Sequence, residues 1–238
     1  TPGPAPEWVA QAGKIQVTNG NPTIHVTDNS GNVYVAGRSP SDHSDYDYNI
    51  VKFDSNGHRI WSARYNGPGN GWDSPYALDI DSEGNVYVTG TANTSKTSSA
   101  IATIKLDRDG EQRWVALYGS LESRSWPTGL ALDSDGFVYL TGSSSGDKVS
   151  PENVTIKYDA NGNEVWRARV QAAAPATLIN LARLAVKQDG SVYVTGSNWE
   201  KGRATDYVVI KYDSLGKQLW RNTYNGPNNG ADNVAGMA

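Results

Sequence analysis

The densest group of side chains that could do chemistry lies in one short acidic segment, Ser41 to Asp47. It holds Asp42, His43, Asp45 and Asp47, which are three carboxylates and one imidazole within six residues. Oxygen ligands of this kind suit Ca²⁺, and His43 adds the nitrogen that a transition metal accepts. The spacing fixes no coordination geometry, however, because solvated loops are also rich in acidic residues. We therefore predict a solvated loop, with a calcium site as the alternative and no other cofactor.

Nucleophilic or acid–base catalysis has little support in the sequence. The chain has three His and no Cys, which excludes disulfides, thiolate metal sites and a Cys nucleophile. The sequence lacks the Gly-x-Ser-x-Gly, His-Glu-x-x-His and phosphate-loop signatures. Loop carboxylates could still converge as the acid–base pair of a lyase or glycoside hydrolase. The candidates are Asp45, Asp147, Glu152, Glu200 and Asp206. We predict a protein that is not an enzyme, with such an enzyme as the alternative.

Length and charge exclude several classes of partner. The chain of 238 residues is long enough for one large domain with its own core. Its net charge of -4 and pI of about 5.4 argue against nucleic acid or an anionic membrane as the main partner. No apolar run approaches the roughly 18 residues of a membrane span. The chain opens at Thr1 without an apolar leader, so we expect any export signal to have been removed.

The elements that would position these residues repeat along the chain. The Trp residues at 8, 61, 114, 166 and 220 are separated by 53, 53, 52 and 54 residues. Two further markers recur in the same register. They are the tyrosines Tyr34, Tyr87, Tyr139 and Tyr193 and the lysines Lys52, Lys105, Lys157 and Lys211. Three markers in one register establish an internal repeat of about 53 residues.

Each repeat reads as four short strands. In the second repeat we predict strands at Tyr76 to Asp81, Val86 to Gly90, Ala102 to Asp107 and Gln112 to Tyr118. Short turns with Gly in fourth position join the strands in pairs, and eight such turns occur along the chain, at 28–32, 54–58, 81–85, 107–111, 133–137, 159–163, 187–191 and 213–217. Repeated four-stranded antiparallel units are typical of β-propeller blades. We therefore predict an all-β propeller with four full repeats and partial strands at both ends.

The two faces of such a disk differ in sequence. One face carries the eight short turns. The opposite face, here called the long-loop face, carries the segments 38–48, 91–101, 143–153 and 197–207 and those after each Trp strand. Trp72, Trp126 and Trp199 stand outside the repeat and fall on this face. An exposed Trp suits stacking on a sugar ring or on a partner's side chain, whereas a buried one packs the loop base. We predict Trp72, Trp126 and Trp199 as ligand-binding candidates.

Several of these motifs resemble the SBBP-type β-propeller repeat, a family found mainly in exported and surface-associated bacterial proteins. The resemblance is carried by Trp61 to Gly71 with its Tyr-Asn-Gly-Pro-Gly-Asn-Gly run, by Asp81 to Gly90, by Thr103 to Asp107 and by Asp159 to Trp166. It implies a seven-bladed ring and an extracellular or cell-surface location, and it implies no catalytic residues. The third and fourth repeats depart from it in the loop after the Trp strand.

The ends of the chain give the remaining predictions. Residues 1–7 read as a Pro-rich linker and residues 8–238 as the propeller segment, which we interpret as a fragment of a larger propeller. We predict an interaction scaffold whose long-loop face binds a partner protein or a glycan. The alternative is self-assembly, because open blade edges can pair between chains and give a homo-oligomer or a fibre.

Overall fold

The computed structural model describes residues 24–41, 45–119, 122–146, 149–171, 177–200, 204–227 and 230–232. Within these ranges the regular structure is β-strand, and no helix is long and apolar enough to cross a membrane. The predicted linker 1–7 and Trp8 lie outside the described residues, as do Asp42, His43 and Asp147.

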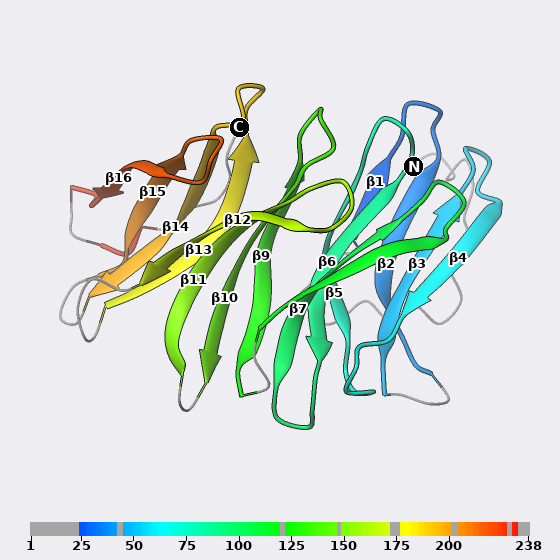
Figure 1. The fold of residues 1–238 in the computed structure, drawn as a ribbon, viewed down its shortest axis with the longest axis horizontal. Coiled ribbons are helices and arrows are strands. Elements are labelled where there is room, and N and C mark those ends of the chain that lie inside the picture. Colours follow the sequence, from blue (N-terminus) through cyan, green and yellow to red (C-terminus); the bar gives the residue numbers. More distant parts are fainter. Residues whose placement is uncertain are drawn as a thin grey trace, which may run out of the picture.

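Sixteen strands follow one another as four antiparallel meanders, here called meanders 1 to 4 (Figure 1). Meander 1 contains β1 (Ile24–Thr27), β2 (Val33–Ser39), β3 (Asp47–Phe53) and β4 (Arg59–Tyr65). Meander 2 contains β5 (Ser74–Ile80), β6 (Val86–Asn93), β7 (Ser99–Leu106) and β8 (Gln112–Tyr118). Meander 3 contains β9 (Arg124–Leu132), β10 (Val138–Gly146), β11 (Val149–Tyr158) and β12 (Glu164–Gln171). Meander 4 contains β13 (Thr177–Val186), β14 (Val192–Glu200), β15 (Asp206–Tyr212) and β16 (Gln218–Tyr224). The predicted all-β, antiparallel class is confirmed.

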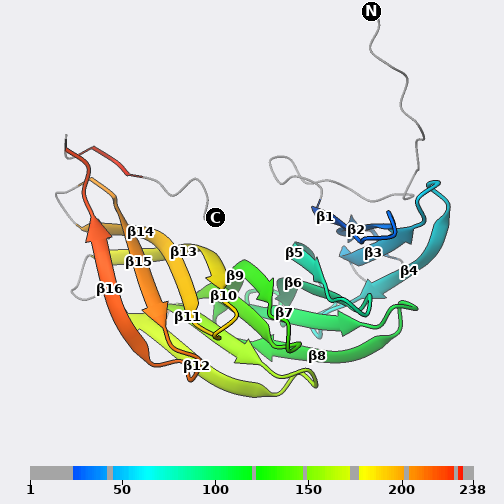
Figure 2. The ribbon, with the colours of Figure 1, turned by 90° about the horizontal axis from the view of Figure 1, so that it is seen from above.

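The meanders form an open arc. The first strand of each meander lies on the inner side and the fourth on the outer side (Figure 2). A parallel bridge between Ser99 and Arg124 joins meanders 2 and 3 into one eight-stranded sheet, while meanders 1 and 4 are separate sheets. Across the described residues the sheets do not close into a ring. The number of blades in a complete propeller therefore stays a prediction.

The three sequence markers of the repeat form one row across each meander. In meander 1, Tyr34 pairs with Lys52 across β2 and β3, and Lys52 pairs with Trp61 across β3 and β4. Directly opposed residues point to the same face of a sheet. The Lys52 ammonium therefore lies 4.9 Å from the Tyr34 ring centroid, and the Tyr34 and Trp61 rings meet edge to face at 6.1 Å. The same row recurs in the other three meanders, which explains why the markers keep one register.

The eight short turns share one geometry. The glycine of each turn has a φ between 74° and 86°, a left-handed conformation that other residues adopt at a cost. In seven of the turns the first residue is Asp, and in the first turn Asp28 accepts hydrogen bonds from the backbone N–H groups of Ser30 and Asn32. The Tyr34 hydroxyl also donates to Asp28, at 3.2 Å, and burial with this carboxylate raises the pKa of Tyr34 to about 12. The predicted hairpin turns are confirmed.

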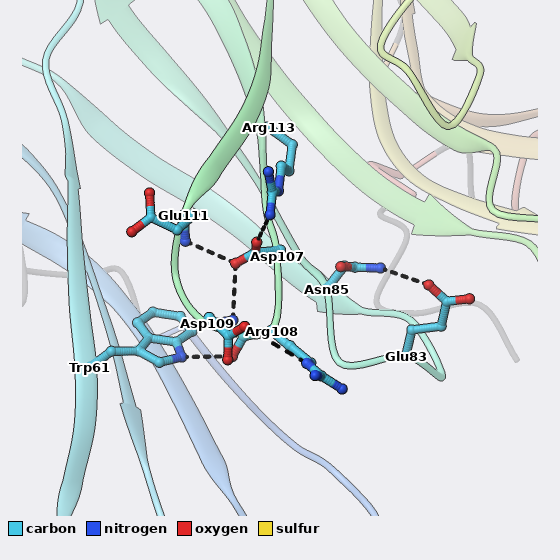
Figure 3. A network of polar contacts seen from close by, with 8 residues as sticks. All are labelled: Trp61, Glu83, Asn85, Asp107, Arg108, Asp109, Glu111 and Arg113. Atoms are coloured by element: carbon cyan, nitrogen blue, oxygen red, sulfur yellow. Dashed lines mark hydrogen bonds and ion pairs between the residues drawn. The ribbon is translucent and has the colours of Figure 1, made fainter.

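A tryptophan clamp joins each meander to the next (Figure 3). The indole N–H of Trp61 in β4 donates to the carbonyl of Arg108, in the turn between β7 and β8, at 2.9 Å. A Cβ added to Gly110 of that turn would lie 2.8 Å from the Trp61 ring, so glycine is needed there for space as well as for φ. The clamp recurs with Trp114 on Ala160 at 3.0 Å and with Trp166 on Ser214 at 3.1 Å.

The core is divided among the junctions. One apolar cluster packs meander 1 against meander 2, a second packs meander 2 against meander 3, and a third packs meander 3 against meander 4. Buried members of the three clusters include Ile50 and Val88, Ile101 and Leu140, and Tyr139 and Ile210. Both faces of an inner meander therefore contribute to a core cluster.

The segments predicted as long loops are partly strand. In meander 2 the strands β6 and β7 extend to Asn93 and from Ser99, which leaves a connection of residues 94–98. In meander 3 the strands β10 and β11 extend to Gly146 and from Val149. The variable segments of the long-loop face are in large part extended hairpins, because their polar side chains still allow continuous backbone pairing.

Candidate binding surface

Three segments build the best-defined part of the long-loop face. They are the end of β2, the segment before β3, and the loop 66–73 between β4 and β5. Tyr46 pairs with Trp72 in an isolated parallel bridge, and the backbone N–H of Asp73 donates to the Tyr46 carbonyl at 2.8 Å. The segment before β3 and the loop before β5 are thereby fixed side by side.

Trp72 forms an aromatic platform with two neighbours. Its ring centroid lies 4.9 Å from that of Tyr46, with the planes tilted by 56°. The Arg38 guanidinium lies 5.0 Å from the Trp72 ring centroid and 4.9 Å from the Tyr46 ring centroid. Trp72 remains 51% exposed. The platform therefore presents an aromatic surface that neighbouring side chains hold in one orientation.

The loop beneath the platform depends on a buried carboxylate. Asp73 is fully buried and accepts hydrogen bonds from the backbone N–H groups of Gly67 and, at 2.8 Å, Asn93. Burial raises the pKa of Asp73 to about 6, although these two hydrogen bonds act in the opposite direction, and nearby Asp47 adds to the increase. Asp73 thus ties the loop of one meander to the end of β6.

The same loop chemistry recurs near the other end of the chain. Asp232 accepts a hydrogen bond from the backbone N–H of Gly226 at 2.6 Å, and its own N–H donates to the Thr205 carbonyl at 2.6 Å. Thr205 precedes β15 as Tyr46 precedes β3. The motif Tyr-Asn-Gly-Pro-x-Asn-Gly-x-Asp occurs at 65–73 and 224–232, and in both copies the Asp forms the same two kinds of hydrogen bond among the described residues. The second copy has Ala231 where the first has Trp72, so the aromatic platform is particular to the first.

The other two candidate tryptophans are also exposed. Trp126 lies in β9, opposite Ser143, and is 41% exposed, and Trp199 lies near the end of β14 and is 37% exposed. Both stand at the long-loop end of their strands, as predicted. Among the described residues no ring contact joins any two of the three tryptophans, so the structure shows three separate aromatic sites.

The two described carboxylates of the acidic segment, Asp45 and Asp47, lie in different environments. Asp47 is buried and forms an ion pair with Arg64, with 3.1 Å between Oδ2 and Nη2. Asp45 is exposed, and Asp42 and His43 lie outside the described residues. No group of three or more His, Asp or Glu side chains placed for a metal occurs within the described ranges. The predicted calcium site rests on the sequence alone.

The inner side of the arc carries a groove of about 560 Å³ between the first strands. Tyr76, Leu78, Leu130 and Leu184 line it, together with His25, Thr128 and Arg183. Among the described lining residues there is no carboxylate. Of the acid–base candidates, Glu152 lies instead in a cleft between meanders 2 and 3, and the side chain of Glu200 is outside the described set.

Sequence reasoning missed two features. The tryptophan clamp had a signal, since each clamp pairs a repeated Trp with a repeated turn glycine, but their contact crosses about 50 residues of chain. The sequence indicates the cleft that holds Glu152 only through residues that differ between repeats. Arg167 and Arg169 in the third repeat stand where the second has Val115 and Leu117.

Comparison with known proteins supports a β-propeller fold. The family model for SBBP, a beta-propeller repeat, matches residues 60–95 and 113–147. These segments are SBBP repeats. The matched SBBP segments run from the Trp strand of one meander through the first strands of the next, so they include the clamp tryptophans Trp61 and Trp114. No curated protein sequence matches the chain.

Two solved structures share this architecture at low identity. A PL25 polysaccharide lyase, an ulvan lyase solved with a bound oligosaccharide, is 11% identical with a TM-score of 0.53 and aligns over 85% of this chain. An α-L-arabinofuranosidase from Fusarium graminearum is 12% identical with a TM-score of 0.51 and aligns over 87% of this chain. The SBBP-containing chain spans 56% and 66% of the lengths of these two enzymes. Identities this low establish a similarity of fold alone.

Proposed function

We propose that this chain is a non-enzymatic binding module of an exported or cell-surface bacterial protein, and that it binds a glycan through the long-loop face. The observation that carries the proposal is the platform of Trp72, Tyr46 and Arg38. Its indole ring is half exposed and is held by a tilted contact with Tyr46 and a cation–π contact with Arg38, so little side-chain entropy would be lost on binding.

Polar groups in the loop that carries Trp72 support a glycan as the ligand. Asn66 and Asn70 lie in the same loop, are exposed, and are joined by a side-chain hydrogen bond of 2.8 Å. An aromatic ring beside amide donors and acceptors can stack on a sugar and also bind its hydroxyl groups. A protein partner is the other ligand class that exposed tryptophans fit.

A glycan array probed with the labelled chain tests this proposal. We expect binding to at least one glycan, a loss of about tenfold or more in affinity for Trp72→Ala, and near-normal affinity for Trp72→Tyr, which keeps a ring. Ala231→Gly, a truncation at the equivalent position in the second copy of the loop, is the control and should leave glycan affinity unchanged. If the array is blank, or if Trp72→Ala binds like the wild type, glycan binding at this platform is wrong.

Self-assembly is a second candidate because the clamp of the last meander has no successor within the described chain. Trp220 occupies the position of Trp61, Trp114 and Trp166, yet it is 38% exposed. The turn of meander 1 has the geometry that accepts a clamp, with Gly57 at φ 82°. A second copy could therefore place this turn against Trp220, a head-to-tail contact.

Light scattering over a range of concentrations tests self-assembly. If copies associate through the clamp, the mass should rise with concentration, and Trp220→Ala should keep the chain monomeric. Trp72→Ala, which removes an exposed Trp away from this edge, should leave the association unchanged. A monomer at every concentration, or association that survives Trp220→Ala, would contradict this route.

The enzyme alternative has less support. A lyase or glycoside hydrolase would need two carboxylates in reach of one substrate, yet the described residues that line the inner groove include His25, Arg183 and Tyr76 and no carboxylate. Glu152 and Glu164 both line the cleft between meanders 2 and 3. Tyr118 and Arg169 hold Glu152. Arg167 holds Glu164, so each carboxylate already has protein partners.

A further inference from the structure

A cleft of about 550 Å³ lies between meanders 2 and 3, lined by residues of β8, β11 and β12. Tyr118 at the end of β8 lines one wall, and Glu152 of β11 with Glu164, Arg167 and Arg169 of β12 line the other. Its volume falls in the range of small-molecule sites, about 300–1,000 Å³. The cleft is separate from the Trp72 platform, which lies between meanders 1 and 2.

Glu152 is the centre of the first polar group in the cleft. Its Oε1 accepts a hydrogen bond from the Tyr118 hydroxyl at 2.5 Å, and its Oε2 lies 3.3 Å from Nε of Arg169. Burial, together with this bond to Glu152, raises the pKa of Tyr118. The hydroxyl therefore stays protonated and donates to the carboxylate, and a tyrosine from one meander is fixed to a carboxylate of the next.

Arg167 and Glu164 form the second polar group. Nε of Arg167 donates to both Glu164 oxygens, at 3.0 and 3.2 Å, and Nη2 donates to Oε2 at 2.6 Å. The Arg167 guanidinium also lies 5.1 Å from the centroid of the Tyr118 ring. A forked, stacked arrangement of this kind holds a guanidinium in one plane.

The chain contains its own control for whether the fold needs these charges. Counted from the clamp tryptophans, Arg167 and Arg169 correspond to Val115 and Leu117 of meander 2. Counted from the marker lysines, Glu152 corresponds to Ala100, which is buried. The junction between meanders 1 and 2 thus forms with apolar residues at all three positions. Because apolar residues pack at least as well as partly buried ion pairs, stability does not account for the charged set.

We infer that this cleft is a binding site for a neutral oligosaccharide. The lining residues carry two positive and two negative charges, so the cleft as a whole has no excess charge to attract an ion. Fixed carboxylate oxygens accept hydrogen bonds and guanidinium N–H groups donate them, which matches the mixed donors and acceptors of sugar hydroxyl groups. Half of the Arg169 side chain is exposed, so its N–H groups can reach a ligand from the open side.

Calorimetric titration of the whole chain with defined probes tests the inference. The probes are the neutral hexasaccharides of cellulose, xylan, mannan, chitin and amylose, with trigalacturonate as the charged comparison. The test variant is the triple substitution Glu152→Ala, Arg167→Val and Arg169→Leu, which copies meander 2 into meander 3. We expect at least one neutral probe to bind, a loss of about tenfold or more in the triple variant, and an unchanged melting temperature.

Further variants separate this site from the platform. Trp72→Ala should leave binding in the cleft unchanged, so failure of the platform proposal and failure of this one are distinguishable. Tyr118→Phe removes one hydroxyl and should weaken the probe by less than the triple variant does. The inference is overturned if no neutral hexasaccharide binds, if the triple variant binds as well as the wild type, or if trigalacturonate binds more tightly than every neutral probe.

Discussion

The two ends of one junction, that between meanders 2 and 3, follow different rules. At the short-turn end, Trp114 donates to the Ala160 carbonyl at 3.0 Å, as Trp61 donates to Arg108 at the junction before it. Along the strands beyond, Arg167 and Glu152 replace the apolar residues of the preceding junction. The comparison teaches that the repeated residues hold the meanders together, whereas chemistry is available where one repeat departs from the next.

The largest expected effect comes from removing a clamp. Trp114→Ala should lower the free energy of unfolding by about 3 to 5 kcal/mol, because the ring packs against Tyr87, Tyr158 and the turn at Gly162. Trp220→Ala, at the end with no following meander described, should cost about 1 kcal/mol or less. Urea unfolding followed by circular dichroism measures both. Equal losses in the two variants would show that the clamp contact is not what stabilises the junction.

The buried carboxylate of Asp73 makes the free energy of unfolding depend on pH. The folded-state pKa of Asp73, about 6, lies above its ordinary value of 3.8, so the folded chain binds this proton more tightly than the unfolded chain does. This stabilisation is fully present below about pH 4 and is lost as pH rises through about 6, a change of about 3 kcal/mol for a shift of two units.

Carboxyl-carbon NMR titration measures the pKa of Asp73 directly. Asp73→Ser is the matched variant, because Ser125 holds the same place in meander 3, two residues before the proline of the first strand. Its unfolding free energy should lack the loss between pH 4 and pH 7. A titration midpoint for Asp73 at or below its ordinary value would refute the role of burial.

Substitutions at two turn glycines distinguish the cost of backbone strain from the cost of a steric clash with the clamp tryptophan. Gly162→Ala should destabilise by about 2 kcal/mol or more, because φ is 82° and the new Cβ would lie 2.7 Å from the Trp114 ring. Gly136→Ala has the same φ strain, at 81°, but its nearest neighbour is 4.0 Å away. We expect about 1 kcal/mol there from thermal or urea unfolding. If both changes cost the same, steric contact with the clamp ring is unimportant.

The smallest effect on stability is expected on the long-loop face. Trp72→Ala should change the unfolding free energy by about 0.5 kcal/mol or less, since half of the ring is already in water. The same change should remove glycan binding, as proposed above. A loss of several kcal/mol on unfolding would instead make Trp72 a packing residue of the loop.

The sequence predicted what is repeated better than what is particular. Trp61, Lys52 and Tyr34 keep a register because they form one row, so their spacing alone predicted strands, turns and the propeller class. The turn glycines likewise predicted a left-handed backbone. The exposure of Trp72, Trp126 and Trp199 was predicted as one of two outcomes, because sequence does not show what covers an aromatic ring.

Contacts between repeats were beyond prediction. The Glu152 network joins residues 118, 152 and 169, and only the packing of one meander on the next brings them together. Asp47 was one candidate ligand of the alternative calcium site, and the sequence could not show that it forms an ion pair with Arg64 on the neighbouring strand. Four repeats with partial strands at both ends had indicated an incomplete ring, and the described sheets form an open arc, but the repeat does not fix the number of blades.

Backbone NMR of the isotope-labelled chain during titration with the neutral hexasaccharides tests most directly whether binding occurs where the repeats differ. The account predicts chemical-shift changes in the cleft, at residues 117–119, 152 and 167–169, or in the platform loop at 66–72, with the eight glycine turns unchanged. Shifts confined to those repeated turns, or no shifts with any probe, would contradict it.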